Sequence, residues 1–204
     1  MNKFNKIAAF SLLALAMNGG AHAEGWYAGL DLTTSKMDLD GQAKDLSNAG
    51  IIDDQLNGGS LIVGYSFKSW LAVEGGLHGQ HMSQSKNGVD VSTNTSIDTS
   101  SISLAAKLSQ PLAWGFSAYA KPGIAYTRTE LEVVGNATFL GFSDQVSKSA
   151  TKSKVHPNLE VGLDYAFNDH FSAGIGYERQ FDALSLGDEH YSLDTFKLGL
   201  RYHF

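Results

Sequence analysis

The sequence has no cysteine, a deficit of basic residues and no long apolar segment, and each of these absences excludes a class of protein. Without cysteine the chain forms neither disulfides nor thiolate sites, so histidine and carboxylates are the remaining metal ligands. The formal net charge of −6 argues against nucleic acid as a partner. No apolar run approaches the ~20 residues that a transmembrane helix needs.

The amino terminus has the parts of a secretory signal peptide. Lys3 and Lys6 precede a short apolar run, and the small-x-small sequence Ala21-His22-Ala23 follows it. This pattern predicts cleavage after Ala23. The chain is then divided into a signal peptide at 1–23 and one domain at 24–204, and the loss of two lysines changes the charge from −6 to −8. An exported chain without disulfides needs another source of stability, and closure of a β-sheet is one.

Apolar and polar residues alternate repeatedly after the signal peptide, whereas the period of an amphipathic helix is not evident. Eight strands are predicted, at 25–35, 58–67, 70–82, 97–110, 115–130, 152–167, 170–181 and 194–204. Tight connections are predicted at 68–69, 111–114 and 168–169. Long connections rich in Ser, Thr, Asn, Asp and Gly are predicted at 36–57, 83–96, 131–151 and 182–193. Short turns at one end and long loops at the other are typical of bacterial outer-membrane barrels.

One face of the predicted strands is apolar and the other face is polar. The polar face carries five acidic and four basic residues, and most of the strand glycines. Such a face suits a crowded barrel interior, where charges pair and glycine makes room for Tyr27 and Tyr119. The predicted interior ion-pair network consists of Asp31, Glu74, Lys107, Lys121, Glu160, Asp164, Glu178, Lys197 and Arg201.

Aromatic residues gather near the predicted short turns, as in a belt at one membrane interface. A soluble periplasmic β-sandwich is the alternative, but it has no reason to sort aromatic residues in this way. We therefore predict an all-β fold: an eight-stranded antiparallel up-and-down transmembrane β-barrel with short periplasmic turns and long extracellular loops. Pro122 lies inside the fifth strand, where it cannot donate a ladder bond, and predicts a β-bulge. The belt residues are Trp26, Phe67, Trp70, Trp114, Phe116, Phe167, Phe171, Tyr202 and Phe204.

The last strand, "DTFKLGLRYHF", alternates apolar and polar residues and ends on an aromatic residue. Together with "EGWYAGLDL", "NLEVGLDYAFNDHFSAGIGYERQF" and "AYAKPGIAYT", it resembles the small OmpA-like outer-membrane β-barrel family. The resemblance covers the strands and turns but not the loops. It implies residence in the Gram-negative outer membrane. It also implies that Tyr202 and Phe204 belong to a signal that the barrel-assembly machinery reads during insertion.

Two motifs suggest chemistry, and both are incomplete. His190-Tyr191-Ser192 is similar to the His-x-Ser pair of outer-membrane lipid A deacylases, but no glutamate follows to orient the imidazole. His78 and His81 lie three apart, which places them on opposite faces of a strand. Asp188, Glu189 and His190 could hold a divalent cation weakly, although a solvated acidic loop is the simpler interpretation. We predict no catalytic residue, no metal and no cofactor.

Two outward-running strands each contain a Tyr-x-Arg motif, Tyr126-Thr127-Arg128 and Tyr177-Glu178-Arg179. Residue parity places the Tyr and Arg of each motif on the lipid side, with the arginine just past the apolar band. Lys36 has a comparable place after the first strand. Guanidinium groups bind phosphate in a bidentate manner. We therefore predict lipopolysaccharide contacts at Lys36, Arg128 and Arg179, with interfacial snorkelling as the alternative.

The scaffold leaves function to the four long loops, whose mixed charges do not identify a ligand. The resemblance implies a non-enzymatic protein that supports envelope integrity and binds a host-surface, phage or cell-surface ligand through its loops. A narrow small-solute or ion channel is the main alternative, although side chains just fill an eight-stranded lumen. A lipid A-modifying enzyme is the third. We expect a monomer surrounded by outer-membrane lipid and lipopolysaccharide.

Overall fold

The computed structural model describes residues 24–38, 55–87, 91–139, 142–186 and 189–204. The predicted signal peptide lies outside these residues and stays a prediction. Among the residues that are described, no helix has the length and apolar character needed to cross a bilayer. The strands are β1 (Gly25–Asp38), β2 (Gln55–Lys68), β3 (Leu71–Asn87), β4 (Val91–Pro111), β5 (Phe116–Phe139), β6 (Phe142–Ala166), β7 (Phe171–Leu186) and β8 (Glu189–His203).

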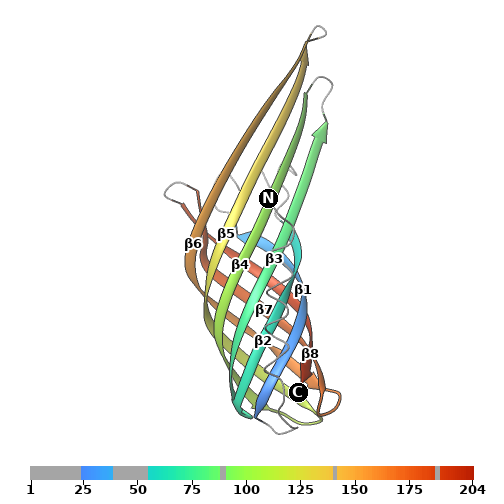
Figure 1. Cartoon of the computed structure of the whole chain (residues 1–204), viewed down its shortest axis with the longest axis vertical. Helices are drawn as coiled ribbons and strands as arrows, with labels where there is room; N and C mark the ends of the chain where they lie inside the picture. The colour runs from blue at the N-terminus through green and yellow to red at the C-terminus, as the bar shows by residue number, and fades with distance from the viewer. Residues whose placement is uncertain (1–23, 39–54, 88–90, 140–141, 187–188) are drawn as a thin grey trace.

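Each strand pairs in antiparallel fashion with the next, and β8 returns to pair with β1. The closing ladder runs from the Tyr27–His203 pair to the Asp38–Ser192 pair. Figure 1 shows the tilted strands wrapping around one lumen, with the carboxyl terminus at the lower end. The predicted eight-stranded antiparallel up-and-down barrel is confirmed.

All eight strands extend further than predicted at the end opposite the carboxyl terminus, and β5 and β6 extend the most. Most of the segments 83–96 and 131–151 is paired strand, because β4 begins at Val91, β5 continues to Phe139 and β6 begins at Phe142. The predicted strand bounds were therefore too short here, and the long connections at these two places consist largely of paired strand. We call the strand residues 83–87, 91–96, 131–139 and 142–151 the outer hairpins, and Figure 1 shows that they project beyond the barrel.

The other two predicted long loops are also shorter than expected. β7 and β8 extend to Leu186 and from Glu189, so most of the segment 182–193 is strand. In the segment 36–57, β1 and β2 account for both ends, and residues 39–54 lie outside the described part of the chain.

The connections at the opposite end are tight, as predicted. In the β6–β7 turn, the Oδ1 atom of Asn168 accepts hydrogen bonds from the backbone N–H groups of His170 and Phe171, both at 2.9 Å. In the β4–β5 turn, Trp114 and Gly115 have positive φ values of 59° and 80°. Glycine adopts such a backbone without steric cost, which explains its place after the tryptophan.

Pro122 does not produce the predicted bulge. Two pairs are missing from the β4–β5 ladder, those that Ala106 and Lys107 would make. The pairs on either side of this gap, Ala105–Gly123 and Leu108–Ala120, have the same register. On its other side, Pro122 is paired normally with Leu159 of β6. The missing N–H of proline therefore interrupts one ladder without inserting an extra residue.

The β6–β7 ladder is the shortest of the eight ladders in the barrel. It runs only from the Asn158–Gln180 pair to the Ala166–Ser172 pair. The β5–β6 ladder on the other side of β6 continues to the Phe139–Phe142 pair at the tip of its hairpin. Among the described strands, the part of β6 before Asn158 therefore pairs with β5 alone.

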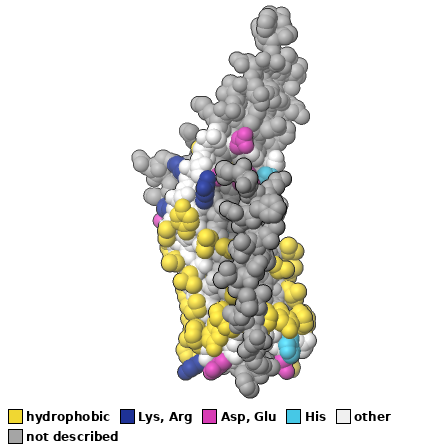
Figure 2. Space-filling view, in the orientation of Figure 1, with side chains coloured by type: hydrophobic (Ala, Val, Ile, Leu, Met, Phe, Trp, Pro, Cys, Tyr) yellow, Lys and Arg dark blue, Asp and Glu magenta, His cyan; other side chains and the backbone are white. Residues whose placement is uncertain are grey.

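Burial in this barrel is the reverse of burial in a soluble protein. Leu32 and Val155 on the outside are 70% and 63% exposed, whereas Tyr27 and His156 in the lumen are 2% and 1% exposed. Figure 2 shows hydrophobic side chains along the lower part of the visible outer surface. An apolar exterior around a polar interior is the arrangement of a barrel wall that faces lipid.

Candidate functional site

A continuous chain of ion pairs fills the middle of the lumen. Lys121 lies at its centre, and its Nζ atom is 2.9 Å from Glu74 Oε2 and 2.8 Å from Glu160 Oε1. At one end of the chain, Lys107 Nζ is 2.6 Å from Asp164 Oδ2 and 3.7 Å from Glu74 Oε1. In spatial order the members are Asp164, Lys107, Glu74, Lys121, Glu160, Lys197 and Glu178.

The other end of the chain holds two carboxylates that face each other across the β6–β7 ladder. Glu160 and Glu178 are direct cross-strand partners. Like charges in such positions repel each other and destabilise the pairing of the two strands. Lys197 of β8 contacts both, with its Nζ atom 2.9 Å from Glu160 Oε2 and also bonded to Glu178 Oε2. One lysine therefore compensates the repulsion between the two glutamates.

Two buried tyrosines donate further hydrogen bonds to this chain. The hydroxyl of Tyr27 donates to Glu74 Oε1 at 2.8 Å, and the hydroxyl of Tyr119 donates to Glu160 Oε1 at 2.7 Å. A Cβ atom added at Gly64 would overlap the Tyr27 ring, and one added at Gly162 would overlap the hydroxyl end of Tyr119. As predicted, glycine makes room for both rings.

Asp31 and Arg201 form a separate pair beside the chain. The Nη1 atom of Arg201 donates to Asp31 Oδ1 at 2.6 Å. The remaining atoms Asp31 Oδ2 and Arg201 Nε are buried without a hydrogen-bond partner among the described residues. The structure thus places all nine of the interior charged residues named from the sequence in the lumen, and each contacts an opposite charge.

Above the ion pairs, toward the outer hairpins, the lumen contains a neutral polar layer. His78 lies between two serine hydroxyls: its Nδ1 atom is 2.7 Å from Ser60 Oγ, and its Nε2 atom is 2.7 Å from Ser103 Oγ. Gln80, two residues further along β3, donates to Ser35 Oγ at 2.5 Å. This layer connects strands through hydrogen bonds, and its five residues include no Asp, Glu, Lys or Arg.

An apolar cluster lies in the lumen beyond the polar layer, and sequence reasoning missed it. We call this cluster the apolar cap: Leu56, Met82 and Leu193 are 3%, 5% and 4% exposed, and Ile97 packs against them. The signal was present in the residue parity, because Met82 shares the lumen-facing positions of β3 with His78 and Gln80. These four side chains come from β2, β3, β4 and β8 and pack together in the lumen near the outer hairpins.

At the short-turn end, the lumen instead opens into a cavity of about 630 Å³, which we call the vestibule. Its walls come from every strand, and its mouth includes Asn168 and Asp169 of the β6–β7 turn. The polar residues that line its interior include Lys107, Ser109, Asp164, Ser172, Arg201 and His203.

The residues predicted to contact lipopolysaccharide lie on the outer face, and the structure brings two of them close together. Lys36 of β1 and Arg179 of β7 are both cross-strand neighbours of Asp194 in β8. Arg179 Nη1 is 3.4 Å from Asp194 Oδ2. Arg128 lies elsewhere, on β5, where its Nη2 atom is 2.6 Å from Glu130 Oε1.

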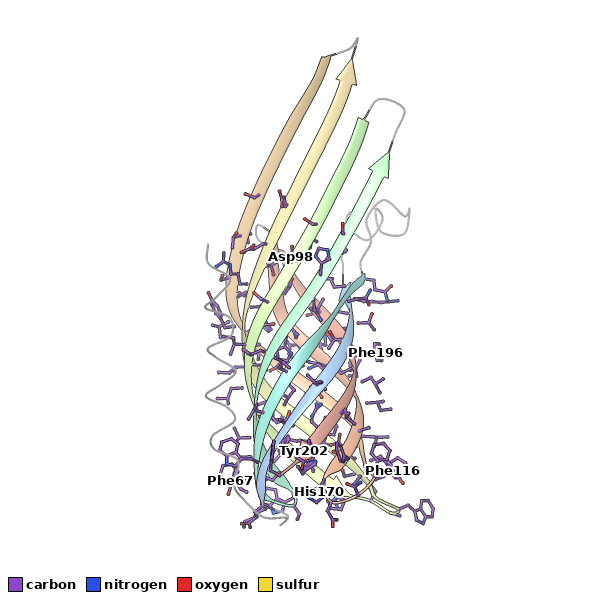
Figure 3. The ribbon with its side chains drawn as sticks, turned by 45° about the vertical axis from the view of Figure 1, so that its right-hand side comes forward. Phe67, Asp98, Phe116, His170, Phe196 and Tyr202 are labelled. Atoms are coloured by element: carbon purple, nitrogen blue, oxygen red, sulfur yellow. The ribbon has the colours of Figure 1, made fainter. Side chains whose placement is uncertain are left out.

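The two histidines considered as metal ligands lie on opposite faces, with His78 in the lumen and His81 outside. His81 Nδ1 is 2.8 Å from Asp98 Oδ1, and Figure 3 shows Asp98 toward the outer hairpins. In the part of the chain that the structure describes, no group of three or more His, Asp or Glu side chains could hold a metal ion. Asp188 and the side chains of Glu189 and His190 lie outside the described residues.

Ser192 of the His-x-Ser motif belongs to β8, where it pairs with Asp38 at the end of the β1–β8 ladder. The side chain of His190 is outside the described residues, so the motif rests on the sequence alone. No contact in the described residues adds an orienting carboxylate to Ser192.

Aromatic rings surround the short-turn end of the barrel. Tyr165 contacts both Phe116 and Phe167, with ring centroids 4.8 and 5.2 Å apart. Phe171 and Tyr202 are 5.1 Å apart. Figure 3 shows Phe67, Phe116 and Tyr202 near the lower end of the molecule, where a belt at one membrane interface is expected.

Phe204, which follows β8, connects this belt to β1. The backbone N–H of Phe204 donates to the carbonyl of Trp26 at 3.0 Å, and its ring lies 4.9 Å from that of Tyr202.

We expect deletion of Phe204 to reduce the folded, protease-resistant fraction in outer membranes at native expression, because the proposed assembly signal and this contact are both lost. Phe204→Tyr, which keeps an aromatic end, is the control. Unchanged insertion of the deletion variant would contradict the role of Phe204 in assembly.

The chain matches a family model over residues 7–204, and the model is described as the outer membrane protein beta-barrel domain. No curated protein is significantly similar to the chain in sequence. Among solved structures, the chain is similar to Ail, the attachment invasion locus protein of Yersinia pestis, with 18% identity and a TM-score of 0.57. This similarity covers 89% of this chain and 99% of Ail.

Two further solved structures share the fold. Neisserial surface protein A is 14% identical, with a TM-score of 0.57 over 91% of this chain and 100% of that protein. The outer membrane protein OprG of Pseudomonas aeruginosa is 17% identical, with a TM-score of 0.51 over 92% of this chain and 99% of OprG. The family resemblance seen in the strands is therefore confirmed. The chain belongs to the outer membrane protein beta-barrel domain family.

Proposed function

We propose that this chain is a non-enzymatic protein of the Gram-negative outer membrane that supports envelope integrity and binds a surface ligand through its outer hairpins. The observation that carries the proposal is the length of the strands in these hairpins. A strand crosses the membrane with about 9–11 residues, whereas β5 and β6 have 24 and 25 residues. More than half of each strand is therefore available outside the bilayer.

The outer hairpins lie on the side that faces other cells. Barrels of this family have short turns on the periplasmic side and their longer connections on the extracellular side. The tight turns of this chain are all at one end, and the outer hairpins are at the other. A paired sheet has a defined backbone, so it supports binding to a macromolecular surface with little ordering entropy.

The contents of the lumen favour this role over a channel. A solute would have to pass the ion-pair chain around Lys121 and then the apolar cap. Breaking buried ion pairs is costly, and an apolar constriction excludes water and ions. An enzyme is less well supported, because no glutamate follows the His-x-Ser motif in the sequence.

Lipopolysaccharide contact is part of the proposal. Lys36, Arg128 and Arg179 lie on the outer face beyond the apolar band, at the depth where phosphate groups are expected. Asp194 and Glu130 already pair with the two arginines, so phosphate binding there would exchange one anionic partner for another.

Solved structures of relatives agree with a role at the cell surface. Ail has been crystallised in complex with the heparin analogue sucrose octasulfate, and that chain is 16% identical with a TM-score of 0.54. At this identity the likeness is one of fold. It supports a test of attachment without identifying the ligand of this chain.

We expect replacement of residues 131–151 by a short Gly-containing turn to abolish attachment of expressing bacteria to an epithelial monolayer. The variant should still fold, because the lower strands keep their ladders and their contact with lipid. Heat-modifiable gel mobility checks folding, and the same replacement at 83–96 shows which hairpin binds. Wild-type protein in planar bilayers should show no sustained conductance. Unchanged attachment in both variants together with frequent ion-selective openings would replace this proposal by the channel.

A further inference from the structure

We propose that the vestibule is a binding site for a small zwitterion that carries both a carboxylate and an ammonium group, such as an amino acid or a dipeptide. This site is separate from the outer hairpins and does not depend on the surface function proposed above. The vestibule has a volume of about 630 Å³. Small-molecule sites in proteins typically measure about 300–1,000 Å³.

The charges at the floor of the vestibule are the accessible end of the ion-pair chain. The side chains of Lys107 and Asp164 are 11% and 16% exposed, whereas those of Lys121 and Glu74, deeper in the lumen, are 5% and 4% exposed. Arg201 also lines the cavity, and its side chain is 9% exposed. At the floor of the vestibule, one acidic and two basic side chains therefore meet a molecule that enters from the short-turn end, past Lys68 and Asp169, which also line the cavity.

This pattern matches a zwitterion better than an ion of one sign. A ligand carboxylate can pair with Lys107 or Arg201, and a ligand ammonium group can pair with Asp164. The internal Lys107–Asp164 pair is then exchanged for two pairs with the ligand, and the total charge in the cavity stays the same. A simple anion or cation would leave one of these partly buried charges uncompensated, which is costly.

Neutral polar groups complete the walls. The hydroxyls of Ser109 and Ser172 line the cavity, and Ser172 Oγ lies 3.0 Å from His203 Nε2. Hydroxyl and imidazole groups can both donate and accept hydrogen bonds, so they suit the amide or polar side chain of a short peptide. The remaining space is enough for more than a single carboxylate.

The vestibule is entered from the short-turn end. It opens among the tight turns, whereas the ion-pair chain and then the apolar cap of Leu56, Met82, Ile97 and Leu193 lie between it and the outer hairpins. In an outer-membrane barrel these turns face the periplasm. The ligand is therefore a periplasmic small molecule rather than an extracellular one.

The probe for this site is glycylglycine, which has one ammonium and one carboxylate group. Its two controls each keep one charge: N-acetylglycine is an anion, and glycinamide is a cation. Purified full-length mature protein, folded in detergent micelles, is titrated with each compound while the backbone amide chemical shifts of Ser109 and Ser172 are followed. We expect glycylglycine to bind at least tenfold more tightly than either control.

Variants connect the binding to the vestibule. Ser109→Trp fills the cavity without removing a charge, and Asp164→Asn removes the partner of the ammonium group; each should weaken glycylglycine binding at least tenfold. Glu130→Gln, on the exposed outer face, is the matched control and should bind as the wild type does. Heat-modifiable gel mobility confirms that each variant is folded.

Equal affinity for the three compounds, or unchanged affinity in folded Ser109→Trp, would overturn the proposal and leave the vestibule as a water-filled recess. A barrel with the hairpin replacement at 131–151 should retain glycylglycine binding. The two functions can therefore fail independently.

Discussion

Replacement of Glu160 by alanine is expected to lower the free energy of unfolding by about 3–5 kcal/mol, the usual cost of removing one partner of a buried ion pair. Glu160 accepts hydrogen bonds from Tyr119 and Lys197 and pairs with Lys121, at 2.7 to 2.9 Å. Alanine would remove one carboxylate from each of two buried ammonium groups, so that Lys121 would keep only Glu74 and Lys197 only Glu178 among their present ion-pair partners.

The urea midpoint of the barrel folded in detergent micelles measures this effect. Glu160→Gln should fall between wild type and Glu160→Ala, because it keeps the hydrogen-bond acceptor but removes the charge. Glu130→Ala is the control, since Glu130 is exposed on the outer face and its pair with Arg128 contributes about 0–1 kcal/mol. Equal midpoints for Glu160→Ala and Glu130→Ala would show that the ion-pair chain contributes little to stability.

Replacement of Gly162 by alanine is the second change with a large expected effect. The added Cβ would overlap the backbone carbonyl of Ile175 on β7 and the hydroxyl of Tyr119. The carbonyl belongs to the β6–β7 ladder and cannot move away without loss of a strand pair. Overpacking of this kind typically costs about 1–3 kcal/mol and sometimes more. Displacement of the tyrosine would also remove a hydrogen bond from Glu160.

Gly79→Ala is the matched control, because a Cβ added at that glycine has no other atom within 4 Å. It should leave the urea midpoint unchanged or raise it slightly, since alanine restricts the unfolded chain. If both substitutions shift the midpoint by the same amount, the effect comes from glycine itself and not from the space that the tyrosine needs.

The lower barrel could be predicted from the sequence because lipid and lumen impose opposite demands on alternate residues. Leu198 and Leu200 face outward and Lys197 and Arg201 face inward, so parity alone located the interior charges. The individual partners could not be predicted in this way. Which carboxylate meets Lys121 depends on the stagger of all eight strands, and this stagger is a property of the closed barrel.

The outer hairpins could not be predicted, because their composition resembles that of loops. Ser92, Thr93 and Asn94 have little apolar alternation, yet they pair with Asn136, Gly135 and Val134 across the β4–β5 ladder. Pairing with a neighbouring strand overrides weak strand propensity. The apolar cap is hard to predict for a related reason: Leu56 and Leu193 lie in predicted long connections, and Met82 and Ile97 are the end residues of predicted strands.

The short β6–β7 ladder gives the barrel wall a mechanical weak point. Under lateral tension the hydrogen bonds between two strands share the force, so the ladder with the fewest hydrogen bonds resists separation least. In the β6–β7 ladder, Glu160 also lies directly opposite Glu178. Lys197 of β8 pairs with both of these glutamates. The Lys197 side chain therefore links β6, β7 and β8 at the position where the barrel would open first. The strand that carries it is also the one that closes the barrel, so closure and reinforcement of the wall occur together.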